Sequence, residues 1–350
     1  MRFPALLVAA LLVACGHTSP PTGADLDRWT GPWQPGPPIQ LFPGPVTVLN
    51  LSADGSGLVI ARSDPDRFRR RPDYREHFAG LLPIAGGSGL WDYSDDRPSQ
   101  FDSLNNVVLA AYRPGALLVQ EETGPISHDT ERLDYPVFWH VELYLLDPLD
   151  TGDRRKLLDL FDEVGGHAVV PAGTLNWFFA IQWAGDDRFV GEGGHLLVKP
   201  MEPIERLGLF VGTIAADTTT LERIDDLAGV DRWSVTADNQ VLLQSGHDLA
   251  LLPLDGGGRQ PLATIPGAPE RVVMVSRCDL AACWAISRDG PITSGDWMLW
   301  RIDRHAPQSD LVRTFTPPRH GTPLLPPAGR DLLVRVDGLL YLAPNLLPTP

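Results

Sequence analysis

Short apolar runs alternate with polar turns rich in Gly and Asp from about residue 38 to the end of the chain. A turn followed by an apolar run recurs five times, at residues 52–60, 112–119, 183–190, 236–243 and 327–334. Short runs bounded by such turns are typical of β-strands. Gly and Pro number 34 each, which disfavours long helices. The pattern therefore predicts an all-β chain of many short strands.

A second apolar run and a second polar turn complete each repeat, as in residues 142–152, 207–220, 248–258 and 296–302. Combined, the two halves predict four-stranded units of roughly 40 to 70 residues, a repeat length typical of β-propellers. The units lie near residues 43–103, 104–160, 161–224, 225–264, 265–316 and 317–348.

The turns resemble those of TolB-like β-propellers over about residues 38–348. Ser52-Ala53-Asp54-Gly55 is similar to the turn that follows the inner strand of a blade in that family, and Asp150-Thr151-Gly152 is similar to the turn before the outer strand. The resemblance implies a fold and no particular function.

We expect six four-stranded blades, or seven if the long first unit is divided. A β-sandwich or two half-barrels are the alternatives. The last unit supplies little outer strand, whereas residues 38–42 have the pattern of one. We therefore predict that residues 38–42 pair with the last unit and close the ring, which protects strand edges that otherwise promote aggregation.

The N-terminus has the order of a bacterial lipoprotein signal. Arg2 provides a positive start, and the apolar run at residues 5–13 is too short to span a bilayer as a helix. Leu12-Val13-Ala14-Cys15 resembles a lipobox, which implies that Cys15 is lipidated. Gly16 in place of Asp favours the outer membrane if the host is Gram-negative. The alternative is a buried N-terminal helix with an incidental cysteine.

These features predict three segments: a signal peptide at residues 1–14, a lipid-anchored Pro-rich tether at 15–37 and a propeller domain at 38–350. Pro-rich tethers tend to be extended. We expect the protein to be exported and anchored through its lipid in the cell envelope.

Cys278 and Cys283 flank a predicted hairpin between strands at residues 272–276 and 284–287. In an exported protein, this pair favours a disulfide. Two free thiols remain open as an alternative. A metal site is the weakest reading, because no further ligands occur at suitable spacing.

The formal net charge is −15, from 29 basic and 44 acidic residues. Nucleic acid is therefore not an expected partner, since phosphate binding needs a basic face. We also expect no cofactor and no metal. Nucleophile-elbow, zinc-protease and P-loop motifs are absent, so the sequence favours a protein that is not an enzyme.

One charged and aromatic insertion, at residues 64–78, interrupts the repeat pattern. Long loops in compact domains are often functional, although a solvated loop is the alternative. The candidate binding residues in it are Arg69, Arg70, Arg71, Tyr74 and His77.

The leading hypothesis is a non-enzymatic, monomeric propeller that binds a protein or another ligand of the envelope. The second is a glycan hydrolase or lyase with acidic and His side chains in the central funnel. His140 and Glu142 share one face of a predicted strand, but sequence supplies no partners for them. Most of the ten tryptophans are expected to pack between blades, and some to line the axial mouth.

Overall fold

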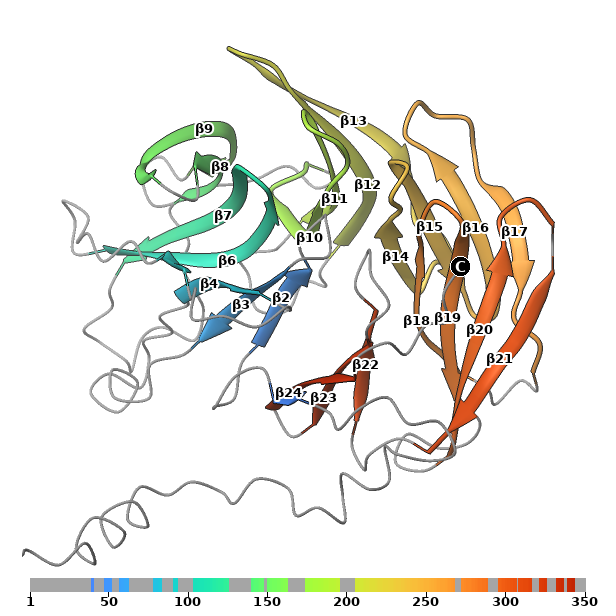
Figure 1. The fold of residues 1–350 in the computed structure, drawn as a ribbon. Coiled ribbons are helices and arrows are strands. Elements are labelled where there is room, and N and C mark those ends of the chain that lie inside the picture. Colours follow the sequence, from blue (N-terminus) through green and yellow to red (C-terminus); the bar gives the residue numbers. More distant parts are fainter. Residues whose placement is uncertain are drawn as a thin grey trace, which may run out of the picture.

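Antiparallel sheets arranged around a common axis form the structure, as Figure 1 shows. The computed structural model describes residues 39–40, 47–51, 57–62, 78–83, 91–93, 103–125, 140–147, 150–162, 174–195, 205–267, 272–288, 295–306, 308–316, 321–325, 332–336 and 339–343. In this part of the chain, 24 strands form six four-stranded sheets. Within the same ranges there is no helix of the length and apolarity needed to cross a membrane. The prediction of an all-β propeller is confirmed.

Five sheets consist of four consecutive strands each. The first two contain β2 (Thr47–Leu51), β3 (Gly57–Arg62), β4 (Phe78–Pro83) and β5 (Trp91–Tyr93), then β6 (Ser103–Arg113), β7 (Ala116–Pro125), β8 (His140–Asp147) and β9 (Asp150–Asp162). The third contains β10 (Trp177–Trp183), β11 (Arg188–His195), β12 (Glu205–Ile214) and β13 (Thr219–Asp225). The fourth and fifth contain β14 (Arg232–Val235), β15 (Gln240–Ser245), β16 (Asp248–Pro253) and β17 (Gln260–Thr264), then β18 (Val272–Cys278), β19 (Ala282–Arg288), β20 (Trp297–Asp303) and β21 (Ser309–Phe315).

The remaining sheet is composite, because it joins the two ends of the described chain. Its order is β22 (Thr322–Leu324), β23 (Leu332–Val336), β24 (Leu339–Ala343) and β1 (Ile39–Gln40). Ile39 lies opposite Leu342, and Gln40 lies opposite Tyr341. The predicted pairing of this N-terminal segment is therefore confirmed at these two residues. The long first unit of the sequence forms one sheet, β2–β5, and the described strands form neither a sandwich nor two half-barrels.

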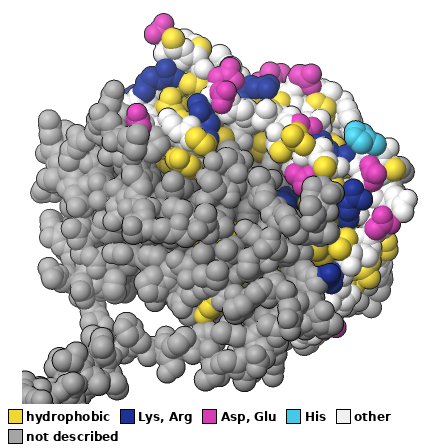
Figure 2. Space-filling view, viewed as in Figure 1, with side chains coloured by type: hydrophobic (Ala, Val, Ile, Leu, Met, Phe, Trp, Pro, Cys, Tyr) yellow, Lys and Arg dark blue, Asp and Glu magenta, His cyan; other side chains and the backbone are white. Residues whose placement is uncertain are grey.

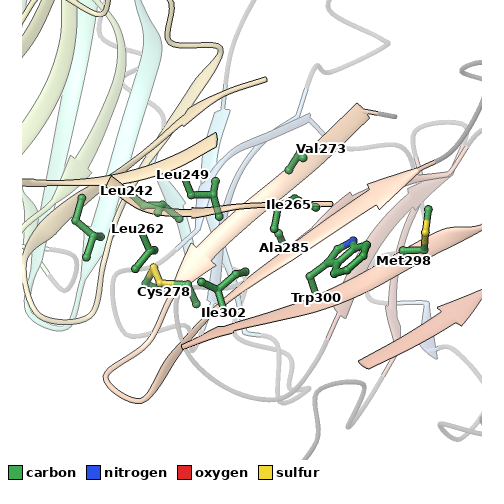
Figure 3. Packing of buried hydrophobic residues seen from close by; sticks show 12 residues of the cluster. Leu242, Leu249, Leu262, Ile265, Val273, Cys278, Ala285, Met298, Trp300 and Ile302 are labelled. Carbon is green, nitrogen blue, oxygen red and sulfur yellow. A yellow bond between two sulfur atoms is a disulfide. The ribbon is translucent and has the colours of Figure 1, made fainter. Parts of the chain in front are cut away.

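Neighbouring sheets pack face to face, because side chains of a strand point alternately to its two faces. Val241 and Leu243 of β15 belong to the apolar cluster shared with the third sheet, whereas Leu242 between them belongs to the cluster shared with the fifth. In β19, Cys283 and Ala285 likewise alternate with residues that pack toward the composite sheet. Figure 3 shows the cluster between the fourth and fifth sheets. Apolar side chains are thus required on both faces of these sheets.

The two ends of the propeller differ in their connections. Connections between the first and second, and between the third and fourth strands of a sheet lie at one end, which we call the tight-turn end. The other connections lie at what we call the long-connection end. The three longest intervals between described strands, residues 63–77, 126–139 and 163–176, are each flanked by strand ends on the long-connection side. The predicted binding residues Arg69 to His77 fall within the first of these, outside the described residues.

Arginine side chains link successive sheets at the tight-turn end. Arg113 at the end of β6 donates a hydrogen bond to the backbone oxygen of Asp186, at 2.6 Å, in the turn between β10 and β11. Arg155 of β9 donates to the backbone oxygens of Ala215 (2.8 Å) and Ala216 (2.7 Å), between β12 and β13. Each arginine therefore satisfies carbonyl groups of a turn in the next sheet.

Arg304 joins two such turns. Its Nη1 and Nη2 donate to the two carboxylate oxygens of Asp238, at 2.9 and 2.7 Å, and Nη1 also donates to the backbone oxygen of Asp279 at 3.0 Å. Burial alone raises the pKa of Asp238, but hydrogen bonds from Arg304 and Thr236 outweigh it, so the pKa lies below its usual value. The charged form of Asp238 therefore belongs to the folded structure.

The predicted disulfide between Cys278 and Cys283 closes the turn that Arg304 contacts. The two cysteines lie opposite each other on β18 and β19. Within the turn, Oδ1 of Asp279 accepts two backbone N–H groups at 2.8 Å, and Oδ2 accepts the indole N–H of Trp284 at 3.0 Å. The cross-link and these hydrogen bonds fix this part of the tight-turn end.

Replacing Arg304 with Met should lower the free energy of unfolding by about 2 kcal/mol at pH 7, because the carboxylate of Asp238 loses its charged partner. The folded pKa of Asp238 is below the unfolded value of about 3.9, so this contribution is present above that value and is lost as the pH falls through the folded pKa. Urea unfolding of the wild-type and Arg304→Met proteins at a series of pH values should show a difference that shrinks below pH ~4.

Arg301→Met is the matched control, since Arg301 is an exposed arginine on β20. Its effect should stay within about 0.5 kcal/mol at every pH. A difference between wild type and Arg304→Met that is the same at pH 7 and pH 3 would contradict the role given to Asp238.

Candidate functional site

Buried polar side chains concentrate at the long-connection end. Ten polar or charged residues of the described chain are buried, and Thr236 and Arg277 are the two that lie at the tight-turn end. Gln120 and Glu121 lie midway along β7, and the other six lie nearer the long-connection end: Asn176, Glu192, His195, Gln244, Ser287 and Arg288. Burying polar groups is costly unless they are paired, so their partners decide what this end can do.

Gln120 of β7 connects the second sheet to the third. Its side-chain oxygen accepts the backbone N–H of Phe178 at 3.0 Å, and its amide nitrogen donates to the Phe178 oxygen at 3.2 Å. Phe178 is on β10, which is the edge strand of its sheet, so these backbone groups face away from its β11 partner. An amide side chain carries both the donor and the acceptor that such an edge needs.

Two further glutamines act in the same way. Gln244 of β15 donates to the backbone oxygen of Val273 at 2.9 Å, on the edge strand β18. Gln182 of β10 accepts the backbone N–H of Val235 at 2.8 Å, on the edge strand β14. The three glutamines therefore attach the first or second strand of one sheet to the inner strand of the next sheet.

Glu192 of β11 occupies the position that Gln120 has in the preceding sheet. Gln120 pairs with Leu109 directly after the register shift in β6, and Glu192 pairs with Ala180 directly after the shift in β10. Oε2 of Glu192 accepts the indole N–H of Trp233 at 2.9 Å, whereas Oε1 lies 3.2 Å from Nε of Arg206. The site thus combines a buried carboxylate, an indole and a guanidinium.

His195 ends β11 at the same end of the propeller and is 3% exposed. Its Nδ1 lies 3.2 Å from the backbone oxygen of Thr174. This contact fixes the ring next to the segment that leads into β10. The described residues contain no group of three or more His, Cys, Asp or Glu side chains that could hold a metal ion.

Charged side chains also form a cluster on the second sheet. Arg154 donates to the buried carboxylate of Glu121 at 2.8 Å and lies 4.5 Å above the ring of Tyr144. The Tyr144 hydroxyl donates to Glu142, which also accepts a hydrogen bond from Lys156 at 3.1 Å. Burial, followed by the hydrogen bond to Glu142, raises the pKa of Tyr144. The phenol therefore stays protonated and acts as a donor.

A surface groove lies at the outer edge, where β13 of the third sheet meets the fourth. Arg259 lines it and binds both oxygens of Asp225, at 2.8 and 2.6 Å. The hydrogen bonds from Arg259 hold the pKa of Asp225 below its usual value. Figure 2 shows acidic and basic side chains interspersed over the visible described surface. The charges of this groove are thus engaged with each other.

The structure places only some of the residues that the sequence singled out. Cys15, Arg69, Arg70, Arg71, Tyr74 and His77 lie outside the described residues. Trp183, Trp284, Trp297 and Trp300 are at most 5% exposed and pack in the core, as expected for most tryptophans. Trp177 and Trp233 are partly exposed at the start of inner strands, at the long-connection end.

No family model matches the chain, and no curated protein matches it. Among solved structures it is similar to an oligogalacturonate lyase in complex with manganese, with 14% identity, 85% of this chain and 76% of that chain covered, and a TM-score of 0.44. It is also similar to a gluconolactonase from Xanthomonas campestris (13% identity, 88% and 96% covered, TM-score 0.39). A third similar structure is YCF48 bound to D1 peptide, with 10% identity, 87% of this chain and 82% of that chain covered, and a TM-score of 0.42. At these values the likenesses carry no argument about a substrate or partner.

The prediction that the protein is not an enzyme was wrong, because it took the absence of a familiar catalytic motif to exclude catalysis. The similar structures include a lyase and a gluconolactonase, so the absence of a familiar catalytic motif from a chain of this kind does not exclude catalysis. Any activity of this chain has to be argued from its own residues.

Replacing Gln120 with Leu should lower the free energy of unfolding by about 2–4 kcal/mol, because two buried backbone groups of Phe178 lose their hydrogen bonds while the volume is nearly kept. Chemical denaturation measures the effect. Gln308→Leu, at an exposed glutamine, should change stability by less than about 0.5 kcal/mol. Equal effects of the two substitutions would show that the glutamine contact contributes little.

Proposed function

We propose that the protein is an exported lipoprotein, anchored through Cys15, whose propeller binds a ligand of the cell envelope at its long-connection end. In this proposal the composite sheet is the sixth blade of a closed, monomeric ring, and the tether at residues 15–37 joins the ring to the lipid. The lipobox-like Leu12-Val13-Ala14-Cys15 and the apolar run before it support export and anchoring.

The observation that carries the binding proposal is the coincidence of two features at one end of the ring. Six of the ten buried polar side chains of the described chain lie in the half of the ring nearer this end, and the three longest intervals between described strands begin and end at strand ends on this side. Binding sites concentrate on long connections held by a rigid scaffold and need convergent polar groups. The tight-turn end has short turns whose carbonyl groups are already engaged by arginines.

A protein partner fits the charge best. The net charge of −15 disfavours nucleic acid and anionic lipid headgroups as ligands. An enzyme that acts on an envelope glycan is the second candidate, because Glu192 and His195 are both buried at the same end and are of types that act as general acids and bases.

Replacing Cys15 with Ser should abolish metabolic labelling by a radioactive or clickable fatty acid and move the protein from the membrane to the soluble fraction, since the acyl chains provide the anchor. Replacing Cys278 and Cys283 together is the control and should leave both the label and the membrane fraction unchanged. Retention of the label in Cys15→Ser would contradict lipidation at this residue.

A photo-crosslinking amino acid in place of exposed Glu205, at the long-connection end, should give one dominant crosslinked product in living cells. The same group in place of exposed Asp217, at the tight-turn end, should give none. Mass spectrometry identifies the product, and a glycan found there would be tested for turnover by wild type and by Glu192→Gln. A product obtained only from position 217 would place the binding face at the wrong end.

A further inference from the structure

Glu192 places a carboxylate where the second and fourth sheets have Gln120 and Gln244, whereas the first and fifth sheets have the apolar residues Val59 and Ile286 after their register shifts. At the equivalent register position Gln120 uses its donor and its acceptor to bind the edge of β10, and Gln244 donates to the edge of β18. A carboxylate has no donor for a backbone carbonyl group. If this position only had to attach the next inner strand, glutamine would serve better. Attachment of the next inner strand therefore does not explain why position 192 has a carboxylate.

The two carboxylate oxygens of Glu192 differ in their contacts. Oε2 is held by the indole N–H of Trp233 at 2.9 Å. Oε1 is buried and accepts no hydrogen bond from the described residues, although Nε of Arg206 lies 3.2 Å away. The residue is 8% exposed, so most of its carboxylate is removed from water. A buried carboxylate gains stability from a well-placed cationic donor, and Oε1 accepts no such hydrogen bond from the described residues.

Arg206 is a loosely held neighbour of this carboxylate. Its side chain is 64% exposed, whereas that of Glu192 is 11% exposed. Ion pairs with an exposed partner contribute little, because water and salt compete with them and the long side chain loses freedom. The pair nevertheless shows that a guanidinium group can reach Oε1 from the solvent side. Arg206 thus occupies a place that a second guanidinium group could take.

We propose that Glu192 is a binding residue for an arginine side chain of a partner protein, and that this arginine displaces Arg206. Trp233 holds one oxygen of the carboxylate in place, so the other is oriented before the partner arrives. The negative charge of the whole chain favours the approach of a basic segment. This inference rests on the proposed binding function of the long-connection end and names the chemistry that its ligand offers.

The test uses the full-length protein in detergent, with N-acetyl-arginine amide as the probe and N-acetyl-citrulline amide as its uncharged counterpart. The readout is the NMR signal of the Trp233 indole N–H, assigned by its loss in Trp233→Phe. Increasing concentrations of the arginine amide should shift this signal until the shift reaches a plateau, and the citrulline compound should cause no shift. Glu192→Gln should abolish the shift, because glutamine lacks the charge and already has donors of its own.

Arg206→Ala gives the distinguishing result. Because it removes the competing guanidinium group, it should bind the probe more tightly, by up to about fivefold. Arg301→Ala, at an exposed arginine away from the site, should bind as wild type does. A purely structural role for Arg206 predicts no gain in affinity.

Binding that persists unchanged in Glu192→Gln, or an Arg206→Ala protein that binds no more tightly than wild type, would overturn the proposal. If Glu192→Gln fails to fold, the comparison of Arg206→Ala with Arg301→Ala decides alone. Failure of this test while position 205 still crosslinks would remove the arginine site and leave the proposed function standing. If the probe binds but position 205 gives no crosslink, the arginine site would stand and the proposed binding of an envelope ligand would be removed.

Discussion

Every inner strand of this ring is the edge of its own sheet, and the structure depends on how that edge is satisfied. Backbone groups on the free edge of a strand need partners when they are buried. Gln120, Gln182 and Gln244 supply them from the neighbouring sheet. Neighbouring sheets are therefore joined by these hydrogen bonds as well as by the apolar packing between them.

The packing of both faces restricts where chemistry can lie. Clusters of apolar side chains fill the space between successive sheets from the second to the composite one. Buried polar side chains therefore either lie near the ends of the strands or, like Gln120 and Glu121 midway along β7, form hydrogen bonds with neighbouring strands. At the tight-turn end, Arg113, Arg155 and Arg304 occupy the carbonyl groups of the turns. Toward the opposite end lie the carboxylate of Glu192, the imidazole of His195 and the indole of Trp233.

Much of the fold follows from local sequence pattern. Alternating or continuous apolar runs between Gly- and Asp-rich turns predict the strands, and the short last unit together with residues 38–42 predicts the pairing of β1 with β24. The disulfide follows from two cysteines at the ends of one hairpin. The strand and disulfide signals lie within a few residues of chain, whereas the pairing of β1 with β24 is predicted by comparing the last unit with the other repeats.

The candidate site could not be predicted in the same way. Glu192, Arg206 and Trp233 are brought together by strand register and by contact between two sheets, and neither leaves a motif in the sequence. A signal did exist: aligning the second strands of the repeats places Glu192 beside Gln120. That alignment needs the β-bulge positions, which apolar periodicity alone does not reveal.

The pairing of β1 with β24 has a consequence for how the protein folds during its synthesis. Among the described strands β1 is synthesised first and β24 last, so their pairing can form only after all the described strands between them have been made. A chain that ends early leaves both the first strand and the last completed sheet with open edges, which are recognised by proteases and promote aggregation. The pairing of β1 with β24 therefore covers two strand edges at once, and only when both segments are present in the same chain.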